Sequence, residues 1–418
     1  MGKKLKVFEA FAGYGSQAMA LRNLNVNYEV VAISEIDKYA IRAYEAIHGE
    51  TNNVGDISKV EIEDVPDHDL FTYSFPCTDI SLAGNQLGLK EGSGTRSSLL
   101  WECKKIIEGK KPKFLLMENV KNLISKKHKD DFEEWINYLD EQGYKSYWKV
   151  LNSKDFGIPQ SRERIFVVSI RNDIEIEYEF PQGFESDVIL KDLLEENVDD
   201  SYYVTAEKAS QLISQYKGDL AVSCAIRSRE FKQTGWKDEC PSLLARDYKD
   251  PKNIIMPCST PDRVKKNQNG RRFKEDGEPM FTLTTQDHHG ILEIPLQEPL
   301  FKIRQATKQG YALAYEGDSI NLEQPSSLTR RGRVGKQVAN TLNTSNHQAV
   351  VQNYRIRRLT SRECFRLMGV SDSDIDKIQD EGISKSQQYK LAGNSIVVQV
   401  LEHIFKNFLQ DYIIKDEE

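Results

Sequence analysis

The chain has 418 residues, a length that predicts two or three domains. Hydrophobic residues (39%) and aromatic residues (9%) are frequent enough for folded cores, and no apolar run reaches the roughly 18–20 residues of a membrane-spanning helix. The six cysteines lack zinc-ligand spacing and no signal-peptide core opens the chain, so we expect a cytoplasmic protein without a structural metal or a disulfide framework.

Charge is distributed unevenly along the chain. The formal net charge is −7, yet residues 224–355 hold 21 Lys and Arg against 15 Asp and Glu. A basic segment within an acidic chain is typical of a protein in which one region meets a polyanion. A solvated surface with uneven charge is an equally good interpretation of this feature alone.

The first 170 residues alternate between short apolar runs and helical stretches. The apolar runs predict strands at Leu5–Phe11, Glu29–Ile33, Leu70–Ser74, Phe114–Met117, Trp148–Leu151 and Ile165–Ile170. Helical spacing predicts helices at Gln17–Leu24, Tyr39–His48, Ser98–Glu108 and Asp130–Gln142. This alternation predicts an α/β fold with a parallel sheet, in which ligands bind at the carboxyl ends of the strands.

The pattern changes after Arg171. Short strand-like pieces, turn clusters and most of the prolines follow, including a loose threefold repeat of strand, polar loop and strand that begins at Cys240, Met280 and Ala339. Chance recurrence of common β residues is the alternative to a true repeat. Helical segments return at Cys364–Met368, Lys385–Leu391 and Ile396–Phe408. We therefore expect three parts, at 1–175, 176–354 and 355–418.

The first predicted strand runs into a glycine-rich loop at residues 11–16 (Phe-Ala-Gly-Tyr-Gly-Ser). Glycines between a strand and a helix let the backbone approach a ligand closely, although many such turns need glycine only for packing. Glu35 ends the second strand and Asp56 follows it. A carboxylate after strand two typically binds ribose hydroxyls in this architecture. Each acid alone is more often a surface residue, but with the loop they favour a nucleoside site.

Pro76-Cys77 follows the third predicted strand and opens a loop with glycines at 84, 88, 92 and 94. This density of glycine suggests a lid over a site. A thiol, with a pKa of about 8.5, is the best nucleophile among neutral side chains, although a lone cysteine at a strand end is usually a small buried hydrophobic residue. Cys77 becomes a candidate nucleophile only in combination with the next motif.

Glu118 ends a buried apolar strand, which brings a carboxyl group to the same edge of the sheet. Burial would raise its pKa and keep a proton available, whereas a helix cap or an ion pair with lysine is the plain alternative. Before Ile165, alternation in an extended run puts Gln160, Arg162 and Arg164 on one side. Two guanidinium groups there can hold a phosphate, a base oxygen or the glutamate, or they can form surface salt bridges.

Taken in order, these motifs resemble those of the DNA (cytosine-5) methyltransferase family. Phe-Ala-Gly-x-Gly, Pro-Cys-x-x-x-Ser, Glu-Asn-Val and Gln-x-Arg-x-Arg occur in family order, followed by Arg-Glu-Cys-Phe-Arg-Leu-Met-Gly at 362–369 and Gly-Asn-Ser-Ile at 393–396. The match covers 5–170 and 355–408. The resemblance implies a Rossmann-like methyltransferase sheet, formed by a catalytic domain at 1–175 and 355–418, with a β-rich target recognition domain inserted at 176–354.

The resemblance also assigns the catalytic residues. The Cys77 thiolate would add to C6 of cytosine and make C5 nucleophilic, while Glu118 protonates or hydrogen-bonds N3. Arg164 would hold O2 of the base and orient Glu118, with Arg162 in support. C5 would then take the methyl group of S-adenosylmethionine, and loss of the C5 proton would release Cys77.

A site for S-adenosylmethionine is implied in the same way. Its residues would be Phe11, Gly13, Gly15, Ser16, Glu35, Ile36, Asp56, Ile57, Pro76, Leu99, Asn394 and Ser395. Three positions depart from the family pattern: Glu9 stands where Asp is usual, Ser16 where a second Gly is common, and Thr78 where Gln is usual. These departures can affect cofactor contacts or loop behaviour, but every catalytic group is present.

A cytosine inside a duplex is out of reach, so the resemblance implies base flipping at a cost of roughly a few kcal/mol. The insert would read the target sequence through the major groove. Candidate DNA contacts are Ser81, Gln160, Arg227, Arg229, Arg246, Arg271, Arg272, Arg330, Arg331 and Arg333. The sequence does not sort these arginines between bases and phosphates.

The implied function is methylation of C5 in a specific cytosine of double-stranded DNA. We expect a monomer that does not associate with a membrane. It would serve either a restriction–modification system, together with a partner endonuclease, or a phage that protects its DNA. An RNA cytosine-C5 methyltransferase is one alternative, disfavoured by the long insert at 176–354. A DNA-binding regulator that retains a cofactor pocket is the other, disfavoured by the intact Cys77, Glu118 and Arg164.

Overall fold

The computed structural model divides into two compact units. Unit 1 contains residues 1–196, 279–287 and 360–418, and unit 2 contains 197–278 and 288–359. The residues that the structure describes are 3–76, 80, 96–188, 190–203, 253–263, 271–275, 278–284, 288–295, 301–304, 311–314, 319–321, 333–335, 348–350 and 355–414. Among the described helices, none has both the length and the hydrophobicity needed to cross a bilayer. The functional division at 175 and 354 stays a prediction, because compactness does not test what each part does.

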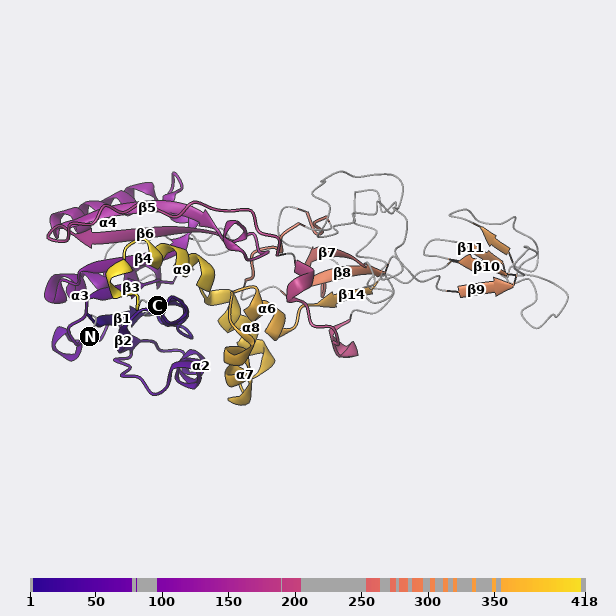
Figure 1. The fold of residues 1–418 in the computed structure, drawn as a ribbon, viewed down its shortest axis with the longest axis horizontal. Helices are drawn as coiled ribbons and strands as arrows, with labels where there is room; N and C mark the ends of the chain where they lie inside the picture. The colour runs from indigo at the N-terminus through magenta and orange to yellow at the C-terminus, as the bar shows by residue number, and fades with distance from the viewer. Residues whose placement is uncertain are drawn as a thin grey trace. The chain divides into compact units, whose positions relative to one another are not determined.

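Unit 1 is built on a six-stranded sheet. Its strands are β1 (Leu5–Ala10), β2 (Tyr28–Ser34), β3 (Leu70–Tyr73), β4 (Phe114–Val120), β5 (Tyr144–Asn152) and β6 (Glu163–Arg171), in the order β2-β1-β3-β4-β6-β5 (Figure 1). The pairs among β2, β1, β3 and β4 are parallel, as expected. This sheet and the antiparallel strands of unit 2 confirm the predicted α/β class with a β-rich part.

The expectation of a wholly parallel sheet is wrong for β6, which runs antiparallel to both β4 and β5. Residues 153–162 alone connect β5 to β6. That segment is shorter than the crossover of about a dozen residues that a parallel pair needs. The apolar pattern of 165–170 predicts a strand but does not encode its direction. Because of the reversal, the residues that precede β6 lie at the same sheet edge as those that follow β4.

Helices pack against this sheet and connect the two ends of the chain. The predicted helices agree within one residue with α1 (Ser16–Asn23), α2 (Lys38–His48) and α4 (Lys129–Glu141), whereas the helix predicted at 98–108 is split into a 3-10 turn (Arg96–Leu100) and α3 (Cys103–Lys110). The C-terminal segment forms α6 (Ser361–Arg366), α7 (Asp372–Asp380), α8 (Lys385–Asn394) and α9 (Val398–Lys406). α9 packs against α1, so the end of the chain returns to its beginning.

Aromatic side chains dominate the core beside the strand ends. Phe71 on β3 stacks between Phe8 on β1 and Tyr73, with ring centroids 5.3 and 5.0 Å away. Trp135 on α4 meets Tyr73 edge-on and donates its indole N–H to the Tyr73 hydroxyl at 3.3 Å. All four side chains are fully buried. Burial of each contributes roughly 2–3 kcal/mol, which gives the loops at the sheet edge a rigid base.

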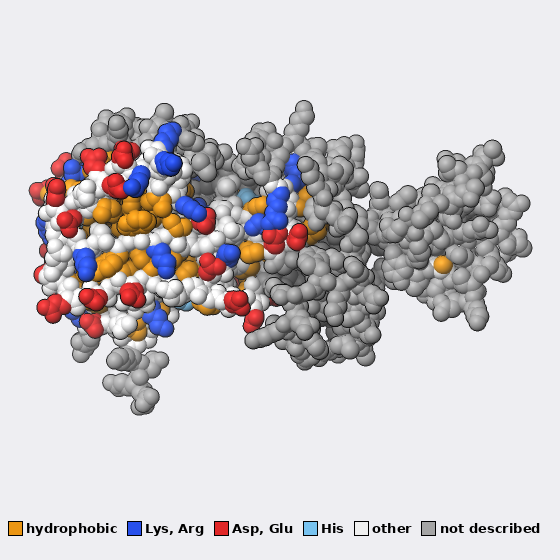
Figure 2. Space-filling model, turned by 90° about the horizontal axis from the view of Figure 1, so that it is seen from above, with side chains coloured by type: hydrophobic (Ala, Val, Ile, Leu, Met, Phe, Trp, Pro, Cys, Tyr) orange, Lys and Arg blue, Asp and Glu red, His pale blue; other side chains and the backbone are white. Residues whose placement is uncertain are grey.

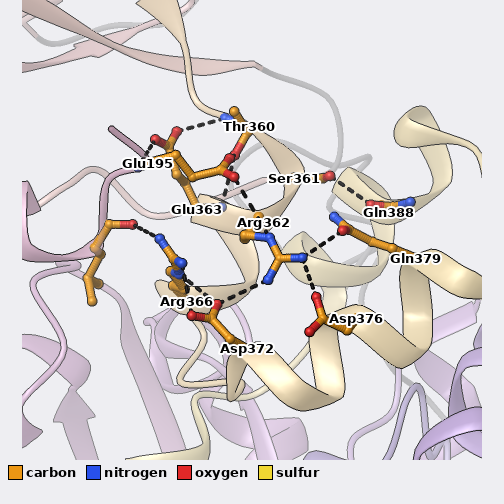
Figure 3. Close-up of polar contacts among 11 residues, drawn as sticks. Glu195, Thr360, Ser361, Arg362, Glu363, Arg366, Asp372, Asp376, Gln379 and Gln388 are labelled. Atoms are coloured by element: carbon orange, nitrogen blue, oxygen red, sulfur yellow. Dashed lines mark hydrogen bonds and ion pairs between the residues drawn. The ribbon is translucent and has the colours of Figure 1, made fainter. Parts of the chain in front are cut away.

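The Arg-Glu-Cys motif of α6 forms a polar network inside unit 1 (Figure 3). Thr360 begins α6 and exchanges capping hydrogen bonds with Glu363. Glu363 is 1% exposed and also accepts a hydrogen bond from the backbone N–H of Glu195 at 2.8 Å. Arg366 pairs with Asp372 on α7 at 2.8 Å. These motif residues therefore hold the segment that leaves unit 1 at Glu195 beside the one that returns at Thr360.

Unit 2 is antiparallel where it is described. β7 (Asn253–Ser259), β8 (His289–Pro295) and β14 (Arg355–Arg358) form a sheet in the order β14-β8-β7. The shorter strands are β9 (Phe301–Arg304), β10 (Tyr311–Ala314), β11 (Ser319–Asn321), β12 (Arg333–Gly335) and β13 (Gln348–Val350). The loose repeat fails at 280–284, which is not a strand: Met280 makes an isolated bridge to Gln160, and both belong to unit 1. The segments that begin at Cys240 and Ala339 lie outside the described residues.

Candidate active site

Loops from neighbouring strands meet at one edge of the sheet in unit 1. The loop after β1 contacts the loop after β2, because the backbone N–H of Gly13 donates to Oε2 of Glu35 at 2.9 Å. The end of β4 contacts the segment after β3, because the side-chain amide of Asn119 donates to the carbonyl of Phe75 at 3.0 Å. The parallel strands thus deliver their following residues to a common place, as the sequence predicted.

The loop after β1 has a constrained backbone. Phe11 (φ +56°), Gly13 (φ +58°) and Gly15 (φ +82°) are left-handed, a conformation that costs a residue with a side chain about 1–2 kcal/mol. A Cβ atom on Gly15 would lie 2.4 Å from Nε2 of His48, whereas one on Gly13 would meet nothing within 4 Å. The loop is therefore packed beneath Gly15 and open above Gly13, where a ligand can approach the backbone.

Glu35 is fixed by backbone hydrogen bonds at the end of β2. Besides the bond from Gly13, its carboxylate accepts from the backbone N–H groups of Ile36 and Asp37 at 2.8 and 2.9 Å. Asn53, which the sequence did not single out, accepts from Glu35 N and donates to Glu35 O, each at 3.1 Å. Ile36 is 72% exposed. A fixed carboxylate beside an exposed apolar side chain suits a ligand that carries both hydroxyl groups and an apolar ring.

The remaining predicted cofactor residues differ in exposure. Asp56 is half-buried and accepts from Ser58 N and Oγ at 3.1 and 2.8 Å, and these bonds lower its pKa. Ile57 is 3% exposed and packs in the core, which argues against a direct contact between its side chain and a ligand. Pro76 is half-buried at the end of the segment after β3, and Leu99 packs against the same core.

Glu118 on β4 and Arg164 near the start of β6 form an ion pair, with Nε and Oε1 3.2 Å apart. Their side chains are only 10% and 17% exposed. Antiparallel register places Arg164 opposite Val120, which brings the pair together. Burial raises the pKa of Glu118, and the charges of Arg164 and Arg162 oppose that rise without cancelling it. The site therefore holds a carboxyl group that retains its proton more readily than an exposed one.

Arg162 connects the start of β6 to residues 393–395, which include two of the predicted cofactor residues. It is 4% exposed, and its guanidinium donates to the backbone carbonyls of Gly393 and Ser395 at 3.2 and 2.6 Å. The Ser395 hydroxyl lies 2.5 Å from the hydroxyl of Ser16 in the glycine-rich loop. Asn394, which lies between Gly393 and Ser395, whose carbonyls accept these bonds, is exposed. Arg162 is thus a buried side chain that holds the backbone of residues 393–395 beside β6, and its supporting role in catalysis stays a prediction.

Two of the predicted DNA contacts, Gln160 and Arg272, have buried side chains. Gln160 is fully buried, and its side chain donates to Leu367 O at 2.6 Å and accepts from Leu283 N at 3.0 Å. Arg272, in unit 2, is 6% exposed and donates to Thr260 O at 2.9 Å. Each side chain is used to hold its own surroundings together. Their roles as DNA contacts stay predictions, and the bonds seen here give each of them a structural role as well.

The other predicted DNA contacts are placed only in part. Arg271 is exposed and pairs with Glu278. The backbone of Arg333 lies in β12. The predictions that lie outside the described residues are Cys77, Ser81, Arg227, Arg229, Arg246, Arg330 and Arg331. On the face of unit 1 seen in Figure 2, basic and acidic side chains are mixed around apolar patches, so charge on that face does not mark a polyanion site.

Comparisons with known proteins agree on one family. The model of the C-5 cytosine-specific DNA methylases matches residues 5–410. The chain is 32% identical to the orphan methyltransferase M.SPRI of Bacillus phage SPR (99% of this chain and 100% of that protein) and 33% identical to the type II methyltransferase M2.ScrFI of Lactococcus lactis subsp. cremoris (97% and 99%). The crystal structure of S. pombe Dnmt2 methyltransferase has the same fold, with a TM-score of 0.55 at 19% identity over 97% of this chain and 99% of that one.

Proposed function

This chain belongs to the C-5 cytosine-specific DNA methylase family and is a DNA (cytosine-5-)-methyltransferase, and from that premise we propose which of its residues perform the reaction. The reaction replaces the hydrogen on C5 of a cytosine with a methyl group. C5 is a poor nucleophile while the ring is aromatic. Addition of a nucleophile at C6 and of a proton at N3 removes that obstacle.

We assign the nucleophile to Cys77 and the acid to Glu118. The Cys77 thiolate adds to C6 while Glu118 gives a proton to N3, which leaves an electron-rich C5. When bound, S-adenosylmethionine supplies the methyl group that C5 accepts. Loss of the C5 proton to a base then drives the electrons back into the ring, the bond between sulfur and C6 breaks, and the thiolate is released, while N3 returns its proton to Glu118.

The buried pair of Glu118 and Arg164 carries this assignment. The carboxyl lies near the end of β4 and its pKa is raised by burial, so it keeps a proton more readily than an exposed carboxyl group does. Arg164, 3.2 Å away, offers planar N–H donors suited to a base oxygen such as O2. The next residue, Asn119, binds the carbonyl of Phe75, two residues before Cys77. This arrangement supports a nucleophile and an acid that act on one base.

The cofactor is proposed to bind against the glycine-rich loop and Glu35. The open space above Gly13 and the exposed Ile36 fit a nucleoside that brings hydroxyl groups and a flat ring. The residues that would hold it are Phe11, Gly13, Gly15, Ser16, Glu35, Ile36, Asp56, Pro76, Leu99, Asn394 and Ser395. Ile57 would support this site from the core rather than touch the ligand.

DNA is the substrate of the family, and we propose that this enzyme acts on a cytosine flipped out of a duplex. Residues 176–354 would form the target recognition domain. The relatives named as an orphan phage methyltransferase and as a type II methyltransferase support either protection of phage DNA or pairing with an endonuclease. A single chain would carry out the reaction.

Transfer of a tritiated methyl group from S-adenosylmethionine to duplex DNA tests this proposal, with tRNA as the competing substrate and Cys77→Ala as the control. We expect label on duplex DNA, none on tRNA and none with the variant. Label on tRNA alone would contradict the proposed substrate.

A duplex that carries 5-fluorocytosine tests the nucleophile. Because fluorine on C5 cannot leave as a proton, the wild-type enzyme should remain covalently attached to the DNA, whereas Cys77→Ala should not. A wild type that methylates DNA without forming the adduct would remove the assignment of Cys77.

A further inference from the structure

Three backbone carbonyls close to Cys77 in sequence are held by side chains from other segments. Asn119 donates to the carbonyl of Phe75 at 3.0 Å, as described above. Ser97 donates its hydroxyl to the carbonyl of Pro76 at 2.8 Å, and Asn122 donates its amide to the carbonyl of Ile80. The last described residue before Cys77 and the first described residue after it are therefore both anchored.

Most residues of these anchors are buried, whereas Asn122 and Pro76 are half-buried. Ser97 and Ile80 are 0% exposed, and Asn119 and Phe75 are each 2% exposed. The carboxamide of Asn119 has a fixed orientation, because its oxygen accepts from the backbone N–H of Val120 at 2.8 Å. Water competes little for buried hydrogen bonds of this kind, so a buried carbonyl that loses its partner is left unsatisfied.

The anchors also connect the segment of Cys77 to the residues that act with it. Asn119 directly follows Glu118, and Asn122 lies three residues further on, in the 3-10 turn Lys121–Ile124. Ser97 lies in the 3-10 turn Arg96–Leu100, which follows the segment with glycines at 84, 88, 92 and 94. One short segment therefore presents the acid and holds both sides of the residue proposed as nucleophile.

We propose that Ser97 and Asn122 are positioning residues for the methyl-transfer reaction, which hold the two sides of the Cys77 segment in register with Glu118. This inference rests on the proposed role of Cys77. The peptide bond fixes the Cα of Cys77 about 3.8 Å from that of Pro76, so an anchor on Pro76 limits where the sulfur can lie. A displacement of about 1 Å between reacting groups can slow a reaction by about 100-fold.

The test measures the rate at which the covalent adduct with 5-fluorocytosine DNA forms, at saturating DNA and cofactor. The variants are Ser97→Ala and Asn122→Ala, with Asn122→Asp as a second variant that keeps the shape of the side chain but lacks the N–H donor. Asn407→Ala is the matched control, because Asn407 also donates its amide to a backbone carbonyl, that of Glu179 at 2.8 Å. Dissociation constants for DNA and cofactor and the melting temperature are measured for each.

We expect Ser97→Ala and the Asn122 variants to slow adduct formation by about 10- to 100-fold while both dissociation constants stay within about twofold of wild type. Asn407→Ala, which removes an exposed hydrogen bond of the same type, should leave the adduct rate unchanged. Adduct rates within twofold of wild type in the anchor variants would overturn the proposal, as would slowing that is matched by equally weakened binding. A wild type that forms no adduct would instead contradict the proposed function.

Discussion

The two halves of the sheet edge are built in opposite ways. On the cofactor side (residues 11–16 and 35–36), the backbone forms the site: left-handed residues turn the loop, and backbone N–H groups fix Glu35. On the catalytic side (residues 118–119 and 160–164), buried side chains form it: Glu118 pairs with Arg164, and Arg162 binds backbone carbonyls. One half is shaped by main-chain geometry and the other by side-chain chemistry.

This difference predicts how substitutions in each half affect the enzyme. A side-chain change on the catalytic side should remove chemistry and spare binding, because the surrounding strands remain packed. A change that adds a side chain on the cofactor side should disturb the loop itself, and with it both folding and cofactor affinity. Kinetic constants and unfolding free energies therefore separate the two halves.

Glu118→Gln should have the largest effect. Gln keeps the volume and a hydrogen-bonding group but has no proton to transfer, so we expect the methyl-transfer rate at saturation to fall by about 100- to 10,000-fold. Single-turnover kinetics measure this rate. The cofactor dissociation constant should change by less than about threefold, since the pair with Arg164 is not a binding group for the cofactor.

The pH dependence of the methyl-transfer rate is a second test of the role of Glu118. The pKa of Glu118 is raised, so its protonated, active form persists above the ordinary range of a carboxylic acid and is lost as pH rises through the raised pKa. The wild-type rate should therefore contain a limb that falls with rising pH, and the residual rate of Glu118→Gln should lack it. The same falling limb in the variant would show that another group is responsible.

The second prediction compares two glycines two residues apart on the cofactor side. Gly15→Ala should lower the unfolding free energy by about 4 kcal/mol, because it combines a left-handed residue with a Cβ that lies 2.4 Å from the His48 ring. Gly13→Ala should cost only about 1 kcal/mol, because its Cβ meets nothing within 4 Å. Urea denaturation measures both values.

For cofactor affinity we expect the opposite order, with a larger effect of Gly13→Ala than of Gly15→Ala. Gly13 faces the open side of the loop, so a methyl group there should weaken S-adenosylmethionine binding in a folded protein. Equal stability losses for the two variants would indicate that steric contact with His48 is relieved by movement of the ring. Unchanged cofactor affinity in Gly13→Ala would place the ligand elsewhere.

The sequence predicts the groups of this site better than the contacts that hold them. Glu118 and Glu35 were found because a strand that ends in a carboxylate is a local pattern. The partners of Gln160 and Arg162 come from residues 283–395, and the anchors of Pro76 and Ile80 from other loops, so their spacing in sequence carries no signal. The alternating pattern predicts that Gln160 and the two arginines lie on the same side of the extended run. It does not predict that the Gln160 side chain is buried.

Other differences have equally specific causes. The direction of β6 follows from the short segment at 153–162, a signal that the alternating pattern did not include. Asn53 was missed because an asparagine in an Asn-Asn-Val-Gly stretch reads as an ordinary turn residue, whereas here its side chain clamps the backbone of Glu35.

The last prediction concerns Glu9, a buried acid on β1 in the part of unit 1 that carries the glycine-rich loop. Glu9 is 0% exposed on β1 and accepts a hydrogen bond from the Tyr44 hydroxyl at 2.8 Å, and burial raises its pKa to about 7. Between pH 4.5 and about 7 the native protein keeps this proton while the unfolded chain releases it, so this group makes stability fall as pH rises. Glu9→Gln removes this pH-dependent contribution to the free energy of unfolding.

We therefore expect Glu9→Gln to match the wild type near pH 4.5 and to exceed its unfolding free energy by up to about 3 kcal/mol at pH 8, as measured by urea denaturation across that range. Burial lowers the pKa of the neighbouring His48 to about 4, and its contribution has the opposite slope, because the unfolded chain binds the proton first as pH falls. That contribution is present in both proteins and cancels in their difference. A difference independent of pH would mean that Glu9 is ionised in the native protein, and the cofactor side would then contain a buried charge rather than a neutral base for its loop.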